Sequence, residues 1–579
     1  MLRDKRGDKK EYLVFLLFGF GTLVLRVFYI SKVNGPFVYA DEFGYWAHAA
    51  HLTGRTWAGV MDGMGWYGFG YSFILAPALL LSGKMTVIYK IAVLFNVAMC
   101  VAVYGLAYLI ARRLFVDWSA LQRGAAAFAA TSFSSYIFYS YVTMSETCVT
   151  LLLWLVFYEL ISTEESPAWW KGLLLGITLG FMYMVHNRMV GVIAAVFFCM
   201  LLLTIQRRFD WKTNISCLAA LIFMIILKRI FQGNFVDMIE NNLVMNDLGI
   251  SIKLGSANAA GSQMEKVAGL FHFQEMKELA LNVIGQLWEC MSATYLLFGL
   301  GGVYAAKRLW HSYKVKKDRC LYLFPILAVI MSIGITAIFF YATPLVEAGG
   351  KTRIDTLFYG RYNECFFGMF ILLGIGMLAE KRKPVYRTYV IILAVYIGLA
   401  AVMYVRLGNT DEAYLNVVSA IGIHMFHWFG EFGVWKCAVI AVLGAAAVTG
   451  VYHIRALHAL RHYVACLLLV FLFATTALHC MRTSIRGEND YTARYNPIFD
   501  YLRDNTEKNE VIYICEKEKM AFDVQTRLAD RILVSIPFEE IDRVQDGTYI
   551  IVGATDTGRL DTEQYRLCLD ENEYWVISK

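Results

Sequence analysis

The sequence carries little charge for its length. Only 17% of its 579 residues are Asp, Glu, Lys or Arg, whereas 58% are hydrophobic. A soluble protein of this size would need far more polar surface and would divide into several domains with separate cores. The composition therefore excludes a conventional soluble protein. The net charge of +6 does not indicate nucleic-acid binding, because the Lys and Arg residues concentrate in short loops between apolar runs.

Motifs of several common protein classes are missing as well. The twelve cysteines form no CxxC pair and no His/Cys spacing suited to zinc, so most of them are interpreted as small buried hydrophobic residues. Only Cys515 and Cys568 fall in a region expected to be soluble. The sequence does not decide whether these two cysteines form a disulfide. No repeat of solenoid period is present. Residues 481–579 lack a GxGxxG or Walker loop, so no catalytic chemistry is assigned to them.

Apolar runs of about 17 to 25 residues recur along almost the whole chain, and each is long enough to cross about 30 Å of hydrocarbon. We expect an all-α polytopic membrane bundle with a cytoplasmic N-terminus, because this orientation leaves most Lys and Arg residues in inner loops. The segment 68–83, with Pro77 inside it, is too short to span and is typical of an interfacial helix. The thirteen expected spans are 11–33, 86–111, 124–143, 146–162, 171–187, 189–205, 213–232, 285–305, 320–341, 362–380, 388–405, 432–452 and 464–480.

This topology places three sizeable segments outside the cell: residues 34–85, residues 233–284 with a helix expected around 263–281, and the tail. The tail contains the β-like runs VIYICEK, RILVSI and GTYIIVGA, separated by helix-like stretches. Alternating strand and helix signals predict a small extracytoplasmic α/β domain of about three to five strands. We therefore divide the chain into a membrane module, residues 1–480, and a C-terminal domain, residues 481–579, with a packing or acceptor-binding role.

The adjacent acids Asp41 and Glu42, in the stretch FVYADEFGYWAHAAHL of the first outer segment, are the most informative residues. Charge near hydrocarbon is costly to bury, so acids at the mouth of a membrane bundle indicate function. The alternative is that Asp41 only caps a short helix, although a cap needs one acid and not two. Neighbouring helical residues point about 100° apart, so the two acids do not suit the paired carboxylates of a glycosidase. We expect one acid to act as a base and the other to orient a partner or a cation.

A synthetic enzyme that faces outward has no nucleotide sugar to use, so it needs an already activated lipid. A polyprenyl-phosphate sugar suits a site with one base, because phosphate leaves without being protonated. One carboxylate then suffices to take the proton from an acceptor hydroxyl as that hydroxyl attacks the anomeric carbon. We predict a glycosyltransferase of this kind, a hexosyl- or pentosyltransferase whose acceptor is a glycan, a lipid or a protein.

The leaving phosphate needs cations on the same face. The stretch KTRIDTLFYGRYNECF carries several just before a late span, although positive residues are disfavoured in outer loops. Arginine binds two phosphate oxygens in a fork, which suits a phosphate lipid. The simpler alternative is an Arg–Asp pair that only stabilises the loop. The candidate cations are Arg55, Lys84, Arg188, Lys351, Arg353 and Arg361.

Other polar residues at outer helix ends have simpler alternatives too. His186 and Arg188 follow an apolar run, where a cation also complements a helix C-terminus. Glu146 begins another span, and stabilisation of that helix N-terminus is its favoured interpretation. Outer aromatic residues suit sugar stacking, but interfacial belts are rich in the same residue types, and the belt is favoured. These aromatic residues are Tyr45, Trp46, Trp66 and Tyr67.

Together these features resemble the GT-C superfamily of integral-membrane glycosyltransferases, in particular the branch with protein O-mannosyltransferases and aminoarabinose lipid A transferases. The likeness rests on an Asp-Glu pair opening a helix in the first outer loop and on the interfacial stretch GYSFILAPALLLSG in the same loop. It also rests on Ser145-Glu146 at the start of a middle span and on Gly360-Arg361-Tyr362 before a late span. The resemblance covers the whole membrane part in layout, and residues 481–579 neither support nor weaken it.

The resemblance implies an inverting transfer from a polyprenyl-phosphate sugar at the outer face of a bacterial-type plasma membrane. It implies that Asp41 is the acceptor base, that Glu42 is its neighbour, and that Lys84 and Arg361, with Tyr362 beside them, bind the carrier phosphate. Some family members use a divalent metal and others do not, and the sequence shows no clear metal cluster beyond the two acids. The expected partners are the lipid-linked donor, the acceptor and membrane lipids, without nucleic acid.

Two other classes stay open. A transporter or flippase would show discontinuous helices in matching halves and charges near the middle of the bilayer. Here the charged residues gather at one face and no halves repeat. A ligase or polymerase of undecaprenyl-linked glycans in cell-envelope polysaccharide assembly would have a similar phosphate-binding face and would differ in its product. The transferase hypothesis requires the Asp41 segment and the Arg361 loop to meet in one cavity on the outer side.

Overall fold

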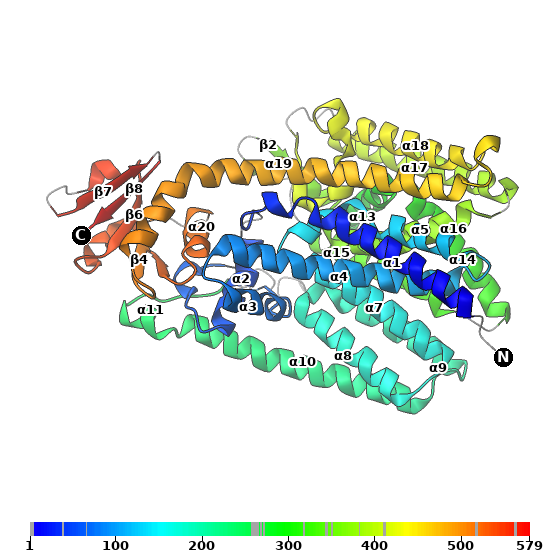
Figure 1. Cartoon of the computed structure of the whole chain (residues 1–579), viewed down its shortest axis with the longest axis horizontal. Coiled ribbons are helices and arrows are strands. Elements are labelled where there is room, and N and C mark those ends of the chain that lie inside the picture. The colour runs from blue at the N-terminus through cyan, green and yellow to red at the C-terminus, as the bar shows by residue number, and fades with distance from the viewer. Residues whose placement is uncertain are drawn as a thin grey trace.

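The computed structural model shows a bundle of long helices that carries a small sheet domain at one end (Figure 1). The first helix, α1 (Lys5–Val27), starts at the end of the long axis that is farthest from this domain. The structure describes residues 5–37, 40–64, 67–255, 266, 269, 272–315, 319–341, 346–348, 351–380, 382–408, 413–515, 519–560, 564–571 and 573–579.

Nine helical segments in the described part of the chain are long and apolar enough to cross a membrane. Large hydrophobic side chains on their outer surfaces are exposed, for example Phe20, Leu94 and Phe223. A surface of this kind suits contact with lipid, in which a helix satisfies its own backbone hydrogen bonds. The chain is therefore a multi-pass membrane protein. The nine segments contain α1, α4 (Met85–Leu114), α7 (Glu146–Glu165), α9 (Val190–Ile205), α10 (Trp211–Glu240), α15 (Cys320–Phe340), α17 (Arg382–Leu407), α18 (Val434–Val451) and α19 (Arg461–Asn505).

The expected count of thirteen spans is not confirmed. The expected span 285–305 is divided between two helices, α13 (Phe273–Ala293) and α14 (Leu297–Val315). The break falls at Tyr295 and Leu296, whose φ angles of 51° and 63° are left-handed and end the first helix. Neither residue is a glycine, so the sequence carries no common sign of this turn.

A second expected span, residues 124–143, is broken where the candidate site lies. It consists of α5 (Ala120–Thr131), the short α6 (Ser134–Phe138) and a single 3-10 turn, η3 (Tyr139–Tyr141). Ser and Thr side chains are dense here, and they compete with the helix for backbone hydrogen bonds. Two other expected spans form shorter apolar helices, α8 (Trp169–Val185) and α16 (Phe367–Leu378).

The end of the bundle nearest the sheet domain carries the first outer segment. The helix α2 (Asp41–Leu52) begins there, and α3 (Ser72–Leu81), with Pro77 inside it, is the short helix expected at the interface. The two helices pack on each other, and α3 packs on α4. Of the second outer segment, residues 233–240 continue α10, and α11 (Leu243–Asp247) follows. Of the helix expected around 263–281, residues 273–281 form the start of a helix that continues to Ala293, and most of residues 263–272 lie outside the described residues.

The loop between α15 and α16 approaches the same end of the bundle. A small sheet of order β1-β2-β3 pairs β1 (Val346–Ala348) with β2 (Lys351–Arg353) antiparallel and β2 with β3 (Ala413–Tyr414) parallel. Three 3-10 turns then lead into α16, and they bring Arg361 into the bundle. These turns are η5 (Asp355–Leu357), η6 (Gly360–Tyr362) and η7 (Glu364–Phe366). A longer 3-10 helix, η9 (Ile421–Phe429), packs beside α19 and α13.

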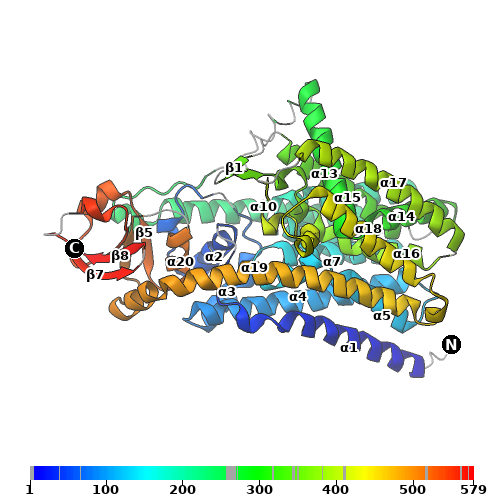
Figure 2. The ribbon, with the colours of Figure 1, turned by 90° about the horizontal axis from the view of Figure 1, so that it is seen from above.

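The last long helix connects the bundle with the C-terminal domain. α19 has 45 residues, which corresponds to about 68 Å of helix, and it runs from the far side of the bundle to the sheet (Figures 1 and 2). The expected domain boundary between residues 480 and 481 falls inside this helix.

The C-terminal domain is a mixed five-stranded sheet of order β5-β4-β6-β8-β7. The strands β5, β4 and β6 are parallel, and β8 joins β6 and β7 antiparallel. The three predicted β-like runs form the three parallel strands, whereas the last two strands were not predicted. The elements are β4 (Val511–Ile514), α20 (Lys519–Arg527), β5 (Ile532–Ser535), the 3-10 helix η11 (Phe538–Arg543), β6 (Tyr549–Gly553), β7 (Arg566–Glu571) and β8 (Tyr574–Ser578).

Candidate active site

The start of α2 fixes the direction of the acidic pair. Asp41 is the first residue of the helix, and the N-cap position before it is Ala40, whose φ of 62° is uncommon for a residue with a side chain. Asp41 therefore does not act as the helix cap. Asp41, Glu42 and Phe43 leave the helix about 100° apart, so the three side chains face different parts of the protein.

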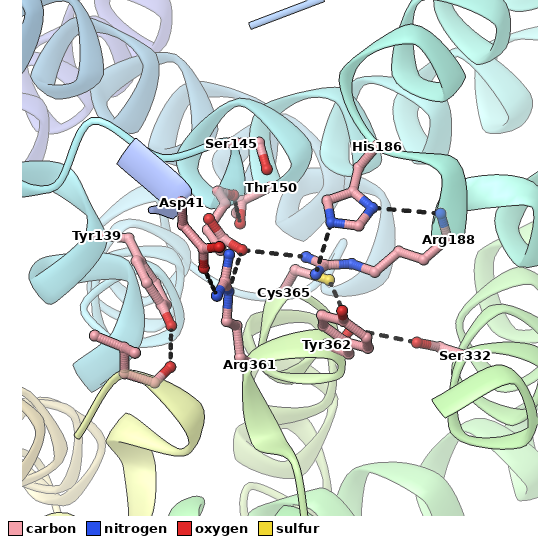
Figure 3. Close-up of polar contacts among 12 residues, drawn as sticks. Asp41, Tyr139, Ser145, Thr150, His186, Arg188, Ser332, Arg361, Tyr362 and Cys365 are labelled. Carbon is pink, nitrogen blue, oxygen red and sulfur yellow. Dashed lines mark hydrogen bonds and ion pairs between the residues drawn. The ribbon is translucent and has the colours of Figure 1, made fainter. Parts of the chain in front are cut away.

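Asp41 faces two donors. Its Oδ2 accepts a hydrogen bond from Arg361 Nη1 at 2.5 Å, and its Oδ1 accepts one from the Tyr67 hydroxyl at 3.0 Å. Burial and the Asp41 carboxylate raise the pKa of Tyr67, so this hydroxyl stays protonated and donates. The Asp41 side chain is 28% exposed, whereas that of Arg361 is 8% exposed. Figure 3 shows the Asp41 carboxylate directed at Arg361. Asp41 is thus oriented within a buried cluster but keeps part of its side chain accessible.

Glu42 is turned into the protein and accepts hydrogen bonds on both oxygens. Phe37 N donates to Oε1 at 2.9 Å, and the Tyr89 hydroxyl donates to Oε2 at 2.7 Å. Thr143 donates to Oε2 from its backbone N–H at 2.9 Å and from its hydroxyl at 2.5 Å. Glu42 is fully buried. Its contacts join α2 to α4 and to the segment before α7, so Glu42 anchors the helix that carries Asp41.

We expect Glu42→Gln to reduce stability more than Asp41→Asn does. A glutamine amide presents donors toward at least one of the groups that now donate to Glu42, and a lost hydrogen bond to a buried charged group costs about 2 kcal/mol. Thermal unfolding of the purified variants in the same detergent measures the difference. Equal melting temperatures for the two variants would contradict an anchoring role for Glu42.

A second carboxylate, Glu146, holds two guanidinium groups. Arg361 Nε donates to Glu146 Oε1 at 2.7 Å, and Arg188 Nη2 lies 3.7 Å from the same oxygen. Glu146, at the N-terminus of α7, is only 4% exposed in its side chain, and Arg188 is 6% exposed. The favoured interpretation of Glu146 as a simple helix cap is therefore incomplete, because its Oε1 forms ion pairs with both arginines. Arg361 donates to both Asp41 and Glu146 and so bridges the two acids.

Two nitrogen atoms of Arg188 can donate further hydrogen bonds. Its Nε and Nη2 are buried, and neither has a hydrogen-bond acceptor among the described residues. The guanidinium lies over the Tyr362 ring, 4.3 Å from the centroid, and Nη1 lies 3.5 Å from His186 Nε2. Because a buried donor without an acceptor is costly, this arrangement suits the binding of a polar ligand.

Lys228 of α10 lies beside the turn that carries Arg188, and it was not among the predicted cations. Its ammonium donates to the Tyr183 carbonyl at 3.1 Å and to the Asn187 side chain, and it lies over the Tyr183 ring. It thereby holds the short turn between α8 and α9 that carries Arg188. The sign in the sequence was a lysine near the end of an apolar run, which is rare in a membrane span.

Three predicted cations lie outside this group of contacts. Arg353 forms a bidentate ion pair with Asp355, and both hydrogen bonds are 2.9 Å long. This is the simpler alternative considered for the loop, an Arg–Asp pair that stabilises it. Arg55 donates to the Leu79 carbonyl at the end of α3, and Lys84 is an exposed residue before α4. The side chain of Lys351 and the residue Trp66 lie outside the described residues.

A narrow cavity lies behind Arg361 and Glu146. Its wall includes Arg26 of α1, which is 1% exposed and donates to the Thr131 carbonyl at 2.5 Å. Glu364 is on the same wall, and its Oε1 accepts from Gly422 N at 2.7 Å. Arg26 was not among the predicted site residues. The stretch TSFSSYIFYSYVTMSET is rich in Ser, Thr and Tyr hydroxyl groups, and this composition was the sequence signal of a polar interior.

The described residues contain no group of three or more His, Cys, Asp or Glu side chains arranged to hold a metal ion. Asp41 and Glu42 point in different directions, so they do not form a joint chelate. Cys515 and Cys568, for which a disulfide had been left open, are both free thiols.

Residues 68–230 match the sequence profile of the dolichyl-phosphate-mannose-protein mannosyltransferase family. This region contains Glu146 and Arg188, whereas Asp41 and Arg361 lie outside it. No match was found among curated proteins.

Solved structures match nearly the whole chain. ArnT from Cupriavidus metallidurans bound to undecaprenyl phosphate has a TM-score of 0.52 and 12% identity over 98% of this chain and 97% of that chain. The apo structure of the same ArnT has a TM-score of 0.52 and 12% identity over 97% of each chain. The oligosaccharyltransferase AglB from Archaeoglobus fulgidus is more distant, with a TM-score of 0.43 and 10% identity over 94% of this chain and 69% of that chain. The fold of the chain is therefore similar to that of ArnT over nearly its whole length.

Proposed function

We propose that this protein is a glycosyltransferase that moves a sugar from a polyprenyl-phosphate donor to an acceptor hydroxyl at the outer face of the plasma membrane. The observation that carries the proposal is one accessible carboxylate, Asp41, held beside two buried guanidinium groups, Arg361 and Arg188. A single base next to anion-binding donors is the arrangement that this reaction requires.

Asp41 is the base of the proposed reaction. Its carboxylate takes the proton of the acceptor hydroxyl while the hydroxyl oxygen forms a bond to the anomeric carbon of the sugar. The bond between that carbon and the phosphate oxygen breaks, and the electron pair leaves with the polyprenyl phosphate. Attack from the face opposite the phosphate inverts the anomeric centre. The hydrogen bonds from Tyr67 and Arg361 keep the carboxylate in one orientation during the transfer.

Arg188 and Arg361 are the proposed partners of the carrier phosphate. The two unaccepted donors of Arg188 suit a phosphate oxygen, because guanidinium groups bind such oxygens in a fork. Tyr362 supports Arg188 from below the plane of its guanidinium, and His186 lies beside it. Glu146 offsets part of the positive charge of both guanidinium groups and holds them inside the bundle. These features support a donor with a phosphate leaving group.

A polyprenyl-phosphate donor is supported by one structure of similar fold. The ArnT structure with the same fold was solved with undecaprenyl phosphate bound. We assign the catalytic module to residues 1–480 and the extracytoplasmic domain to residues 481–579, with the N-terminus in the cytoplasm. The acceptor is a glycan, a lipid or a protein, and the sugar is a hexose or a pentose.

The direct test is transfer from a panel of radiolabelled polyprenyl-phosphate sugars by the purified protein in detergent or nanodiscs. We expect at least one donor to release its polyprenyl phosphate and to label an acceptor in the membrane extract of the source cells. Heat-treated protein and Asp41→Asn protein are the matched controls. Transport of a labelled donor across a liposome without any release of phosphate would instead support a flippase.

A further inference from the structure

The C-terminal domain reaches the helix that carries Asp41. The three residues at the start of α2 face three different partners: Asp41 faces Arg361, Glu42 faces Tyr89 and Thr143, and Phe43 faces the C-terminal domain. Figures 1 and 2 both show α20 of this domain beside α2. The helix is therefore held by the membrane bundle on one side and by the domain on another.

Phe43 is the centre of an aromatic stack between the two parts. Its ring is stacked on Phe522 of α20 with 4.5 Å between ring centroids, and on Trp57, after α2, at 5.6 Å. The Trp57 indole Nε1 donates to the carbonyl of Ala529 at 3.1 Å. Phe43 is 1% exposed, Trp57 is fully buried and Phe522 is 8% exposed. Stacked rings of this kind fix distance and tilt as well as burying area.

The backbone on both sides of α2 is also attached to the C-terminal part of the chain. Before α2, Arg527 Nη1 approaches the Asn34 carbonyl at 3.4 Å, and Asn489 Nδ2 donates to the Lys32 carbonyl at 3.2 Å. After α2, Gly59 packs so closely that a methyl group there would clash with the Leu533 carbonyl of β5. These contacts leave α2 little freedom to shift as a unit.

We propose that the C-terminal domain positions Asp41 for catalysis, with Phe522 and Trp57 as positioning residues that act through Phe43. The inference rests on the proposed function, because it assigns Asp41 as the base. Phe43 is two residues from Asp41 on a single helical turn, so a tilt of α2 about the aromatic stack moves the carboxylate relative to Arg361. A misplacement of about 1 Å is enough to cost about a hundredfold in rate.

The chemistry of the contact favours positioning over acceptor binding at this surface. Its centre is aromatic and closed to solvent, and its one indole donor is already paired with Ala529. An acceptor site would instead need open polar groups on the side of Phe522 that faces α2. The contact therefore fixes the position and tilt of α2 relative to the C-terminal domain.

The test compares Phe522→Ala with Phe522→Leu in the full-length protein in nanodiscs. For Phe522→Ala we expect kcat to fall about ten- to a hundredfold with the donor KM unchanged, and we expect Phe522→Leu to restore most of the rate. Hydrogen exchange of the α2 amides should become faster in Phe522→Ala, while the amides of β4 keep their protection. Phe538→Ala, in the same domain but stacked against Arg559, is the matched control and should change neither quantity.

The outcomes separate the two proposals. Unchanged kcat, or a rise in acceptor KM alone, would overturn positioning by the domain even if the protein is a transferase. Absence of transfer by the natural protein would refute the proposed function, whereas the exchange of the α2 amides would still decide whether the domain orders this helix. If β4 loses protection in Phe522→Ala, Trp57→Phe is the variant to measure. It removes the bond to Ala529 and makes the ring smaller while keeping an aromatic ring beside Phe43, and it should lower kcat severalfold.

Discussion

Replacing Asp41 by asparagine is expected to lower kcat by about a hundred- to ten-thousandfold, the contribution of a positioned general base. The amide has nearly the same shape and still accepts from Tyr67, but it does not take the proton of an acceptor hydroxyl. Binding of the donor should change little, because the groups proposed to hold the phosphate remain. Initial rates of sugar transfer, together with donor binding measured by calorimetry, provide the two quantities.

Asp62→Asn is the matched control for this experiment. Asp62 lies in the same outer segment, is exposed, and accepts a hydrogen bond from Lys253 N at 3.1 Å. Its variant should transfer sugar at the rate of the natural protein. Turnover within a fewfold of normal in Asp41→Asn would reject Asp41 as the base, and Glu42 is too enclosed by its four donors to replace it.

Arg361→Lys is expected to lower kcat/KM for the donor about a hundredfold, mainly through a higher KM. The planar guanidinium bonds Asp41 and Glu146 at the same time, at 2.5 and 2.7 Å. An ammonium is a compact point charge that does not reproduce this fork. Removing the charge altogether leaves Glu146 with one buried partner fewer, and breaking a buried pair costs about 3–5 kcal/mol. Lysine is therefore the more informative substitution for kinetics.

Arg353→Lys provides the comparison within the same loop. Its guanidinium pairs with Asp355, so the substitution should leave the donor KM within about twofold of normal. A large increase in KM for Arg353→Lys, with none for Arg361→Lys, would move the phosphate site from the buried cluster to the outer loop. Steady-state kinetics with varied donor and saturating acceptor distinguish the two results.

The sequence predicted the class of the protein and the segments that meet, because both leave a local pattern. Long apolar runs predict spans, and two adjacent acids at the mouth of a bundle stand out against their surroundings. Helix geometry predicted that Asp41 and Glu42 point in different directions, but most of the partners of each acid were not predicted, because they lie far along the chain. Thr143 and Arg361, which fix the two acids, are 101 and 320 residues away from their partners.

The elements that the sequence missed have physical reasons too. The break at Tyr295 and Leu296 uses left-handed residues that are neither Gly nor Asn, so only the packing of the bundle explains it. The strand β7 lies at the edge of the sheet, and its sequence RLCLDE has an apolar run of only three residues between charged ones, which is short for a strand signal. Arg188 was predicted as a candidate because of its charge. That its Nε and Nη2 groups are buried without a hydrogen-bond acceptor depends on the residues packed around it, and the sequence does not show this.

The uninterrupted course of α19 has a consequence for how the length of this chain can vary. Each residue added to a helix turns everything beyond it by about 100° and moves it by about 1.5 Å. Phe522 of α20 meets Phe43 of α2 in one rotational phase of α19, so a single residue inserted in α19 between the bundle and the domain would turn that ring away from α2. Insertion of a whole heptad restores the rotation but still moves the domain by about 10.5 Å, so the contact fixes the length of this connecting helix.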